Sequence, residues 1–353
     1  MSRPASGLFA PLFEGPLDIV GDVHGELAAL NDLMEILGYD ATGHHPTRRL
    51  VFIGDLCDRG HDSPGTIRLV RRLVAEGAAQ CLLGNHELNA LRGVAKDGNG
   101  WFFDSNHDQA AGRYLESTPL DASERSDVAG FFGALPLVLE RSDLRLVHAA
   151  WDDAAIALLR DCSGTTLDIY RAYAARAADI VKESGLGTRA AAEWEQHGVK
   201  LRDAGCEPPL LSNLGRLDAL YQMANPVRIL TSGPEALTTR PFYAAGKWRM
   251  LERVTWWQRY THERPVLVGH YWRWPDADAR AALTRGEHDL FDGAPIHHWH
   301  GARRNVFCLD FAVGARHKER QIGRQSDFST RLGAVRWPER ELVLDDGTRM
   351  TLA

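Results

Sequence analysis

The sequence has 353 residues, of which 44% are hydrophobic and 25% charged, so it is long enough for one large globular domain or two smaller ones. The formal net charge of -6 and a pI near 6.2 argue against a general affinity for nucleic acid or for acidic membrane surfaces. No apolar run approaches the roughly 18 residues that a membrane span needs.

Five cysteines without regular spacing predict free thiols in a reducing compartment rather than a disulfide framework. The opening residues "MSRPASGLFAPLF" contain one Arg and an apolar stretch broken by proline, which is a poor match to a secretory signal. We therefore expect a cytoplasmic protein that binds neither membrane nor nucleic acid.

Apolar runs typical of strands alternate with helical periodicity through the first 150 residues. Between 27 and 37, for example, leucine recurs at helical spacing, and Gly38 provides a stop. This alternation predicts a largely buried sheet with helices packed on it. The expected strands lie at 17–21, 49–54, 80–84 and 144–150, the expected helices at 27–37, 66–77 and 87–93, and a Gly/Asn/Asp-rich loop around 97–108.

The pattern becomes helical and rich in alanine from about residue 151. We treat 151–245 as a mainly helical insertion that packs beside or over the sheet. Strand patterns return at 265–270, at 305–314 and at 332–347, where the last is typical of a hairpin or meander. Because no linker rich in Pro or Ser divides the chain, we expect residues 1–353 to form a single α/β domain.

Polar side chains follow the apolar strands, usually across a glycine. Sites in open α/β sheets lie at the carboxyl ends of the strands, so five strand ends are expected to converge on one place. The motifs are "GDVHG", "GDLCDRG", "GNHE", "VHAA" and "VLVGH", which supply Asp22 and His24; Asp55, Asp58 and Arg59; Asn85 and His86; His148; and His270.

Each motif alone has an ordinary structural explanation. An Asp-X-His after a strand is typical of a turn, an Asp-Arg pair of a salt bridge, and a strand-end histidine of a hydrogen-bonded structural residue. All of them together, in this order and after successive strands, favour a functional site over five unrelated structural details.

Glycines mark the same strand ends. Gly21, Gly54, Gly84 and Gly269 stand next to or near the polar residues. Glycine suits points where the backbone turns sharply or approaches another group closely, so these positions are expected to be crowded or to have unusual backbone angles.

The ordered motifs GDxHG, GDxxDRG, GNHE, a strand-end His and a later GH resemble the calcineurin-like metallophosphoesterases. More closely they resemble the phosphoprotein phosphatase superfamily, which includes bacterial Rhizobiales-like phosphatases and symmetrical diadenosine tetraphosphatases. The resemblance covers about residues 18–150 and 265–273. It implies an α/β fold in which a β-sandwich of two mixed sheets is flanked by helices, with a helical insertion and a dinuclear metal centre.

The resemblance implies two divalent metal ions, with manganese preferred and iron or zinc compatible with the same ligand types. Asp22, His24 and Asp55 would hold the first ion, and Asp55 would bridge to the second. Asn85, His148 and His270 would complete the second site. Two aspartates cannot neutralise four positive charges, so the centre would stay attractive to phosphate.

The remaining motif residues take catalytic roles in this interpretation. A hydroxide bridging the two ions would attack phosphorus in line. Arg59 would hold phosphate oxygens in a bidentate fork, a geometry that lysine cannot reproduce. His86 would protonate the leaving group, and Asp58 would stabilise the imidazolium form of His86.

Two departures from the family pattern affect the prediction. Ala149 and Ala150 follow His148 where the family usually has glycine. The further substrate-binding arginine of the eukaryotic members has no clear counterpart, and we consider Arg249 and Arg273 as candidates for a second phosphate arginine. A surface or interface role is an equally good explanation for each of them.

The sequence therefore predicts a metal-dependent phosphoric ester hydrolase that acts on phosphomonoesters, with phosphorylated protein (Ser/Thr or Tyr) as the preferred substrate. Symmetrical hydrolysis of diadenosine tetraphosphate is the alternative enzymatic reading. A non-catalytic protein that binds phosphate or metal is the alternative from another class. The expected partner is a phosphorylated protein or small phosphoester, without nucleic acid or membrane.

Overall fold

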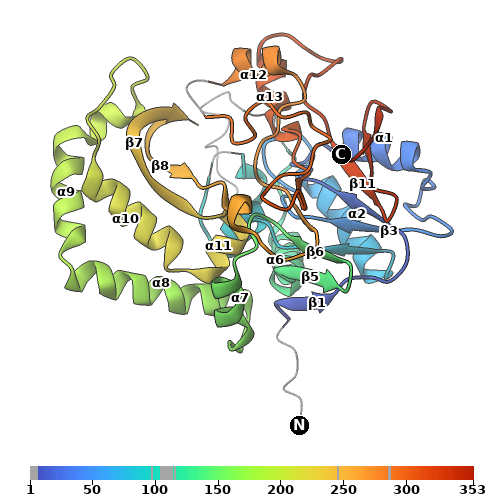
Figure 1. Ribbon diagram of the computed structural model, residues 1–353, viewed down its shortest axis with the longest axis horizontal. Helices are drawn as coiled ribbons and strands as arrows, with labels where there is room; N and C mark the ends of the chain where they lie inside the picture. The colour runs from blue at the N-terminus through green and yellow to red at the C-terminus, as the bar shows by residue number, and fades with distance from the viewer. Residues whose placement is uncertain (1–6, 97, 104–113, 115–116, 245, 285–287) are drawn as a thin grey trace.

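Two β-sheets packed against each other form the centre of the fold, and helices cover their outer faces (Figure 1). The computed structural model describes residues 7–96, 98–103, 114, 117–244, 246–284 and 288–353. Both large sheets mix parallel and antiparallel strands. The expected α/β sandwich of two mixed sheets flanked by helices is confirmed.

The six-stranded sheet contains the first three expected strands in parallel arrangement: β2 (Leu17–Val20), β3 (Arg49–Phe52) and β4 (Ala79–Cys81). The C-terminal meander extends this sheet on the other side of β2 through β11 (Gly333–Trp337), β12 (Glu341–Leu344) and β13 (Arg349–Thr351). The N- and C-terminal parts of the chain therefore share one sheet.

The five-stranded sheet has the order β1-β5-β6-β9-β10. Its members are β1 (Phe9–Pro11), β5 (Val138–Arg141), β6 (Leu144–Val147), β9 (Val266–Val268) and β10 (Val306–Cys308). Strand β9 is parallel to both β6 and β10. The carboxyl ends of these three strands therefore meet at one edge.

Alternation along the strands divides their side chains between two hydrophobic cores. Ile19 and Val51 point into the space between the sheets, where they join Leu146 and Leu267 of the opposite sheet. Val20 belongs to the second core, which lies under the helices. The period of two along each strand thus buries both faces of each sheet.

Helices of the first half cover the sheets. Helix α1 (Leu27–Leu37) buries its leucine face and ends at Gly38, whose φ of 92° is left-handed, as the sequence predicted. The others are α2 (Ser63–Ala75), α3 (Asn85–Leu91), α4 (Gly100–Phe103) and α6 (Ala122–Ala134). Helix α4 occupies part of the loop expected around 97–108, and residues 97 and 104–108 lie outside the described residues.

The segment expected as a mainly helical insertion over 151–245 stands to the left of the sheets in Figure 1. It contains α7 (Asp153–Arg160), α8 (Thr166–Glu183), α9 (Leu186–His197), the 3-10 helix η1 (Gly198–Arg202), α10 (Ser212–Met223) and α11 (Pro226–Ser232). A two-stranded hairpin that the periodicity did not predict follows, formed by β7 (Glu235–Ala244) and β8 (Lys247–Arg253).

Short helices connect the last strands: η2 (Trp256–Arg259), α12 (Ala277–Leu283), η3 (Val313–Ala315) and α13 (Arg316–Gln321). In the part of the chain that the structure describes, no helix combines the length and the apolar character needed to cross a membrane.

Helix α3 begins two residues earlier than predicted. Gly84 is its N-cap, and the carboxylate of Glu87 accepts the Gly84 N–H at 3.0 Å. Asn85 and His86 therefore lie in the first turn of a helix rather than in a loop. A helix fixes their directions more firmly than a loop would.

Candidate metal centre

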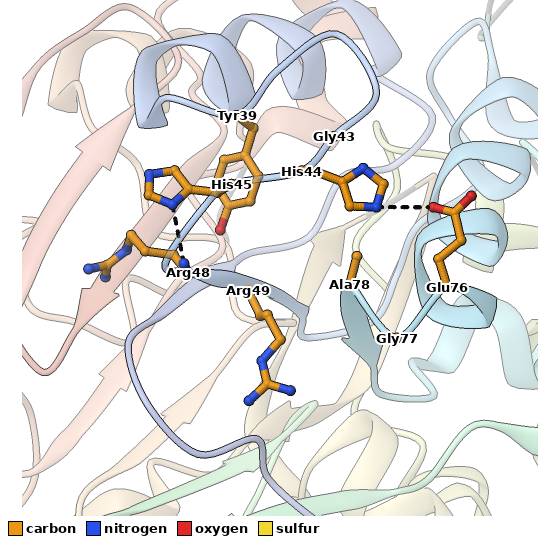
Figure 2. Close-up of a pocket in the computed structure, with 9 residues that line it drawn as sticks. All are labelled: Tyr39, Gly43, His44, His45, Arg48, Arg49, Glu76, Gly77 and Ala78. Atoms are coloured by element: carbon orange, nitrogen blue, oxygen red, sulfur yellow. Dashed lines mark hydrogen bonds and ion pairs between the residues drawn. The ribbon is translucent and has the colours of Figure 1, made fainter.

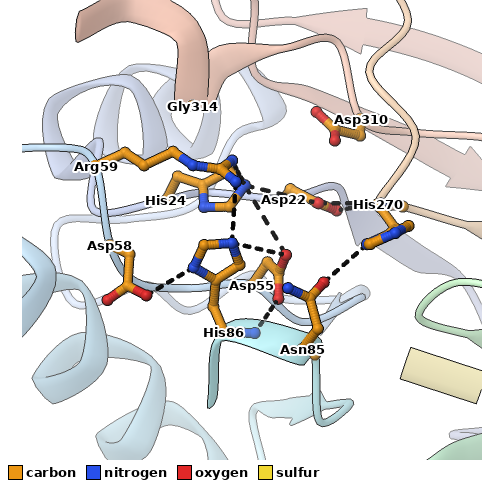
Figure 3. Close-up of polar contacts among 12 residues, drawn as sticks. Asp22, His24, Asp55, Asp58, Arg59, Asn85, His86, His270, Asp310 and Gly314 are labelled. Carbon is orange, nitrogen blue, oxygen red and sulfur yellow. Dashed lines mark hydrogen bonds and ion pairs between the residues drawn. The ribbon is translucent and has the colours of Figure 1, made fainter. Parts of the chain in front are cut away.

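The polar residues predicted at the strand ends come together at one edge of the two sheets (Figure 3). Asp22 and Asp55 follow β2 and β3, while His148 and His270 follow β6 and β9. Asn85 reaches the same place from the first turn of α3. Parallel pairing of β2 with β3, and of β6 with β9, brings these carboxyl ends to a common edge.

Five of the predicted site residues have a left-handed backbone, which side chains other than glycine rarely adopt. Each such residue costs on the order of 1–3 kcal/mol and persists only where its surroundings hold it. They are His24 (φ 49°), Asp55 (50°), Asp58 (71°), Arg59 (75°) and His270 (65°). Their concentration at one place is typical of a functional site.

The predicted glycines allow close approach at the same edge. Gly54 has a φ of 103°, and a Cβ there would lie 2.9 Å from Nδ1 of His148. A Cβ on Gly269 would lie only 1.9 Å from Oδ1 of Asp22. The expectation of crowded or unusual backbone at these positions is confirmed.

Asp55 lies between two groups of candidate metal ligands. On one side, Nε2 of His24 is 3.9 Å from Oδ2 of both Asp22 and Asp55. On the other side, Nε2 of His148 is 3.3 Å from the same Asp55 oxygen. One ligand atom each from Asp55, His148 and His270 lies within 4.8 Å of the others. A carboxylate shared by two groups is the arrangement that a bridged pair of cations needs.

The second group contains oxygen and nitrogen atoms that face one another. Nδ1 of His148 is 2.9 Å from the carbonyl oxygen of Ile53, which only accepts hydrogen bonds, so Nδ1 carries a proton and Nε2 is the nitrogen directed at the group. Oδ1 of Asn85 lies 3.2 Å from this Nε2 and 2.8 Å from Nδ1 of His270. A cation among these atoms would have one oxygen and two nitrogen ligands within reach.

The Asn85 amide has a second acceptable orientation. Turned over, its nitrogen would lie 2.8 Å from Nδ1 of His270 and 3.2 Å from both Oδ2 of Asp55 and Nε2 of His148. That orientation satisfies the residues by hydrogen bonding alone, whereas the carbonyl orientation suits a bound cation. The residues therefore fit a metal ion with its amide oxygen inward.

The three buried imidazoles next to Asp55 have different partners, which separates their roles. His24 and His148 each direct Nδ1 to a backbone carbonyl, that of Cys57 at 3.0 Å in the case of His24. This is the usual way of fixing a metal-binding imidazole. His86 instead directs Nδ1 to Oδ2 of Asp58 at 2.6 Å, and its Nε2 is 3.9 Å from Asp55. The Asp58 carboxylate fixes the His86 ring and leaves Nε2 facing the site.

Arg59 points its guanidinium into the site (Figure 3). Its two terminal nitrogens lie 2.8 Å from Nε2 of His24 and 3.0 Å from Nε2 of His86. The guanidinium is thus directed at the space between the two imidazoles. A cation bound at Nε2 of His24 requires Arg59 to release that nitrogen.

The electrostatics of the site favour bound cations. Burial, and then the charges of Asp310 and Asp55, raise the pKa of Asp22 well above its usual value. Burial, and then the Arg59 charge, lower the pKa of His24. Burial alone would raise the pKa of Asp55. The neighbouring imidazoles outweigh burial, with His148 contributing most, so the pKa of Asp55 lies well below its usual value. Asp22, Asp55 and Asp310 thus lie together in a buried site, where divalent ions would stabilise their charged forms.

Glu87 holds the bridging aspartate in place without facing the site. Its carboxylate accepts the backbone N–H groups of Asp55 at 2.9 Å, of Leu56 at 2.8 Å and of Gly84 at 3.0 Å. Glu87 is fully buried. It is the fourth residue of the "GNHE" motif, so the motif contributes a positioning carboxylate as well as Asn85 and His86.

Asp310 and Gly314 belong to the site but were missed in the sequence. Asp310 follows β10, next to β9, and lies beside Asp22 in Figure 3. Burial raises the pKa of Asp310 to about 6. A Cβ on Gly314 would lie 2.4 Å from Cδ2 of His24. The strand predicted over 305–314 contained the signal, because an aspartate follows its apolar run as in the other motifs.

The structure does not bring Arg249 or Arg273 to the metal ligands. Arg273 is 2% exposed, and its guanidinium donates to the carbonyl oxygens of Pro295 at 2.5 Å and His298 at 3.0 Å. Its guanidinium is therefore buried against this loop and does not face the metal ligands. Arg249 lies on the β7–β8 hairpin and donates from Nε to the Ala244 carbonyl at 3.2 Å.

A separate cavity of about 230 Å³, shown in Figure 2, contains none of the predicted site residues. Arg49, the first residue of β3, and Ala78, which precedes β4, are among its lining residues. The cavity therefore lies at the amino-terminal ends of these strands, opposite the edge that carries the metal ligands. Nε2 of His44 and Oε2 of Glu76, 3.4 Å apart, also line it.

Comparison with known proteins agrees with the motifs. Residues 15–161 match the model of the calcineurin-like phosphoesterase family, which confirms the resemblance inferred from the strand ends. An asymmetrical bis(5'-nucleosyl)-tetraphosphatase of Oceanobacillus iheyensis is 46% identical over 74 residues, covering 20% of this chain and 30% of that protein. A symmetrical bis(5'-nucleosyl)-tetraphosphatase of Methylococcus capsulatus is 34% identical over 140 residues, covering 38% of this chain and 44% of that protein.

The chain thus spans less than half the length of either curated relative. Among solved structures, the cold-active protein-tyrosine phosphatase of a Shewanella species aligns over 99% of this chain and 83% of its own, with 14% identity and a TM-score of 0.45.

Proposed function

We propose that this chain, whose residues 15–161 match the calcineurin-like phosphoesterases, hydrolyses phosphate esters with the help of two divalent metal ions. The observation that carries the proposal is Asp55 between two ligand groups, one with His24 and Asp22 and the other with His148, His270 and Asn85. Manganese is the preferred metal, and the nitrogen and oxygen ligands also suit iron and zinc.

Bound here, two divalent ions supply positive charge for a phosphate group and make a water molecule more acidic. The chain's own residues do the rest. Arg59 is directed at the space above the ligands and binds phosphate oxygens after it releases the imidazoles of His24 and His86. The fork of its guanidinium sets the orientation of the phosphate.

His86 is the candidate proton donor. Its Nε2 faces the same space as Asp55 and Arg59, and Asp58 accepts a hydrogen bond from its Nδ1 at 2.6 Å. Trp101 donates to the other oxygen of Asp58 at 2.8 Å, so the carboxylate is fixed on both sides. Once Arg59 has released Nε2, this arrangement can hold a proton there and deliver it to the departing oxygen.

Two substrate classes follow from different observations. The GDxxDRG and GNHE motifs favour phosphomonoesters, with phosphorylated protein as the substrate. Curated relatives that match this chain are named bis(5'-nucleosyl)-tetraphosphatases, which supports dinucleoside tetraphosphates as the second class. In either case we propose a cytoplasmic enzyme whose partner is its phosphorylated substrate, with no nucleic acid or membrane.

The test is a substrate panel assayed with manganese, zinc and iron(II) added in turn. Diadenosine tetraphosphate, a serine phosphopeptide, a tyrosine phosphopeptide and p-nitrophenyl phosphate cover the proposed classes. We expect metal-dependent hydrolysis of at least one, lost on chelation and reduced by His86→Ala. Metal binding without hydrolysis of any of them would leave the non-catalytic phosphate- or metal-binding role and overturn the proposal.

A further inference from the structure

A cavity of about 320 Å³ adjoins the candidate metal centre, with Asn85 among its lining residues. Its volume is at the lower end of the range of small-molecule sites. It lies between helices α3 and α11 and is lined by Asn85, Leu88, Asn89, Arg92, Lys96, Arg228 and Ser232.

The cavity continues from the metal centre along one face of helix α3. Leu88 and Asn89 lie three and four residues after Asn85, and Arg92 lies four and three residues after them, so all of them share one face of α3 and its C-cap. From Asn85 to Arg92 the helix rises roughly 10 Å. A ligand in the cavity therefore runs from a candidate metal ligand along the helix to a guanidinium.

The lining of the cavity is positively charged. It includes Arg92, Lys96 and Arg228 and no carboxylate. Among the described residues, neither arginine forms an ion pair. Arg92 lies over the ring of Tyr170 at 4.3 Å, and Arg228 donates to the Tyr221 carbonyl at 3.4 Å. These neutral partners fix the side chains without cancelling their charges.

Two carboxylates outside the lining also act on Arg228. The charges of Asp218 and Glu235 interact with it, and both carboxylates are shared with Arg249 of the β7–β8 hairpin. Burial lowers the pKa of Arg92, and the charge of Arg228 lowers it further. Two guanidinium groups that repel each other are better stabilised when an anion lies between them.

We propose that this cavity is a subsite for the additional phosphate groups of a polyphosphate chain whose reacting phosphate lies at the metal centre. The proposal rests on the proposed hydrolase function and selects polyphosphate compounds as the preferred substrate class. Arginine is the residue best suited to phosphate oxygens, because its donors form a fixed fork. A simple phosphomonoester has no group to place beside Arg92 and Arg228.

The experiment compares Arg92→Gln and Arg228→Gln with Arg71→Gln. Arg71 is a partly exposed arginine of α2 whose loss changes the net charge equally. For each protein, kcat/KM is measured on diadenosine tetraphosphate and on p-nitrophenyl phosphate. We expect the ratio of the two values to fall about tenfold in each cavity variant, the effect of losing one charge-assisted hydrogen bond. Arg71→Gln should leave the ratio unchanged.

A second readout tests the cavity without catalysis. Binding of inorganic tripolyphosphate and of orthophosphate is measured by calorimetry on the manganese-loaded protein. The cavity variants should weaken tripolyphosphate binding about tenfold and change orthophosphate binding much less. Arg228→Lys keeps the positive charge, so it should retain part of the tripolyphosphate binding. Thermal unfolding is used to check that each variant is folded.

The outcomes separate the subsite from the proposed function. An unchanged ratio, or an equal loss on both substrates, overturns the subsite and leaves the hydrolase intact. If the unaltered protein hydrolyses neither these two compounds nor the phosphopeptides, the proposed function fails, and tripolyphosphate binding still decides the cavity. Equal binding of tripolyphosphate by all variants overturns the subsite in that case too.

Discussion

Nδ1 of His86 lies 2.6 Å from Oδ2 of Asp58, which makes these two residues a dyad at the edge of the candidate metal centre. The other Asp58 oxygen accepts a hydrogen bond from Trp101 at 2.8 Å. Both residues of the dyad are buried. The geometry fixes which imidazole nitrogen faces the substrate, and hence where a proton is delivered.

The dyad predicts an effect that depends on the leaving group. His86→Ala should reduce kcat for phenyl phosphate about 10²- to 10⁴-fold, the usual contribution of a general acid. The loss should be smaller for p-nitrophenyl phosphate, because its leaving group needs less protonation. Asp58→Asn should show the same preference with a smaller loss. Equal losses on both esters would argue that His86 acts through the structure of the site instead.

Metal content should report on the two ligand groups separately. Asn85→Ala removes an oxygen ligand from the second group only, so we expect one bound manganese to be lost or bound at least tenfold more weakly, with the other retained. Asp55→Asn should weaken both. Asn213→Ala, an amide of α10 that hydrogen-bonds to Glu193, serves as the control. Stoichiometry is measured by elemental analysis after dialysis, and retention of both ions by Asn85→Ala would contradict the assignment.

Crowding at Gly269 predicts that even a methyl group is not tolerated. A Cβ would lie 1.9 Å from Oδ1 of Asp22, so Gly269→Ala must displace a metal ligand or the β9 strand end. We expect activity to fall more than tenfold and metal binding to weaken. In contrast, Gly130→Ala, where a Cβ meets no atom within 4 Å in the middle of α6, should stabilise that helix by about 0.5–1 kcal/mol. Normal metal binding by Gly269→Ala would show that the site adapts to the methyl group.

The raised pKa of Asp310 predicts a pH dependence of stability in protein kept metal-free by a chelator. Between its ordinary value of 3.8 and about 6, the folded protein binds this proton more tightly than the unfolded chain does. This proton therefore contributes to stability below pH 3.8, and the contribution is lost as the pH rises through about 6. Asp310→Asn removes this contribution. Between pH 4 and 6 the free energy of unfolding of the variant should therefore fall less steeply than that of the unaltered protein. The two slopes should differ by up to about 1 kcal/mol per pH unit.

The control for this experiment is Asp161→Asn, which changes an exposed carboxylate at the C-cap of α7. Unfolding by urea at several pH values gives the two slopes. If Asp310→Asn and the unaltered protein lose stability in parallel, the buried carboxyl of Asp310 does not carry the proton in the folded state.

The strand-end motifs predicted most of the site because each one is local. An apolar run places a strand in the core, a glycine lets it turn, and the next side chains must emerge at its carboxyl end. Asp22, Asp55 and His270 could be read in this way. Asp310 follows the same rule but lacked a glycine and a familiar motif, so its place beside Asp22 emerged only from the parallel pairing of β9 with β10.

Other features depended on contacts between distant segments. Arg273 and Arg92 are both arginines near motif residues in the sequence. The fold buries the first against the carbonyls of Pro295 and His298, and it places the second in a cavity with Arg228 of α11. Nothing in the local sequence distinguishes them, because the direction of a long side chain depends on what packs around it.

The sequence by itself determined the α/β alternation and the metal-ligand candidates, since hydrophobic periodicity and strand-end chemistry act over a few neighbouring residues. The two-sheet arrangement was implied by the resemblance of the motifs to a known family. Only the tertiary structure decided which charged side chains share a site, because burial and charge neutralisation depend on distances between segments that the order of residues does not contain.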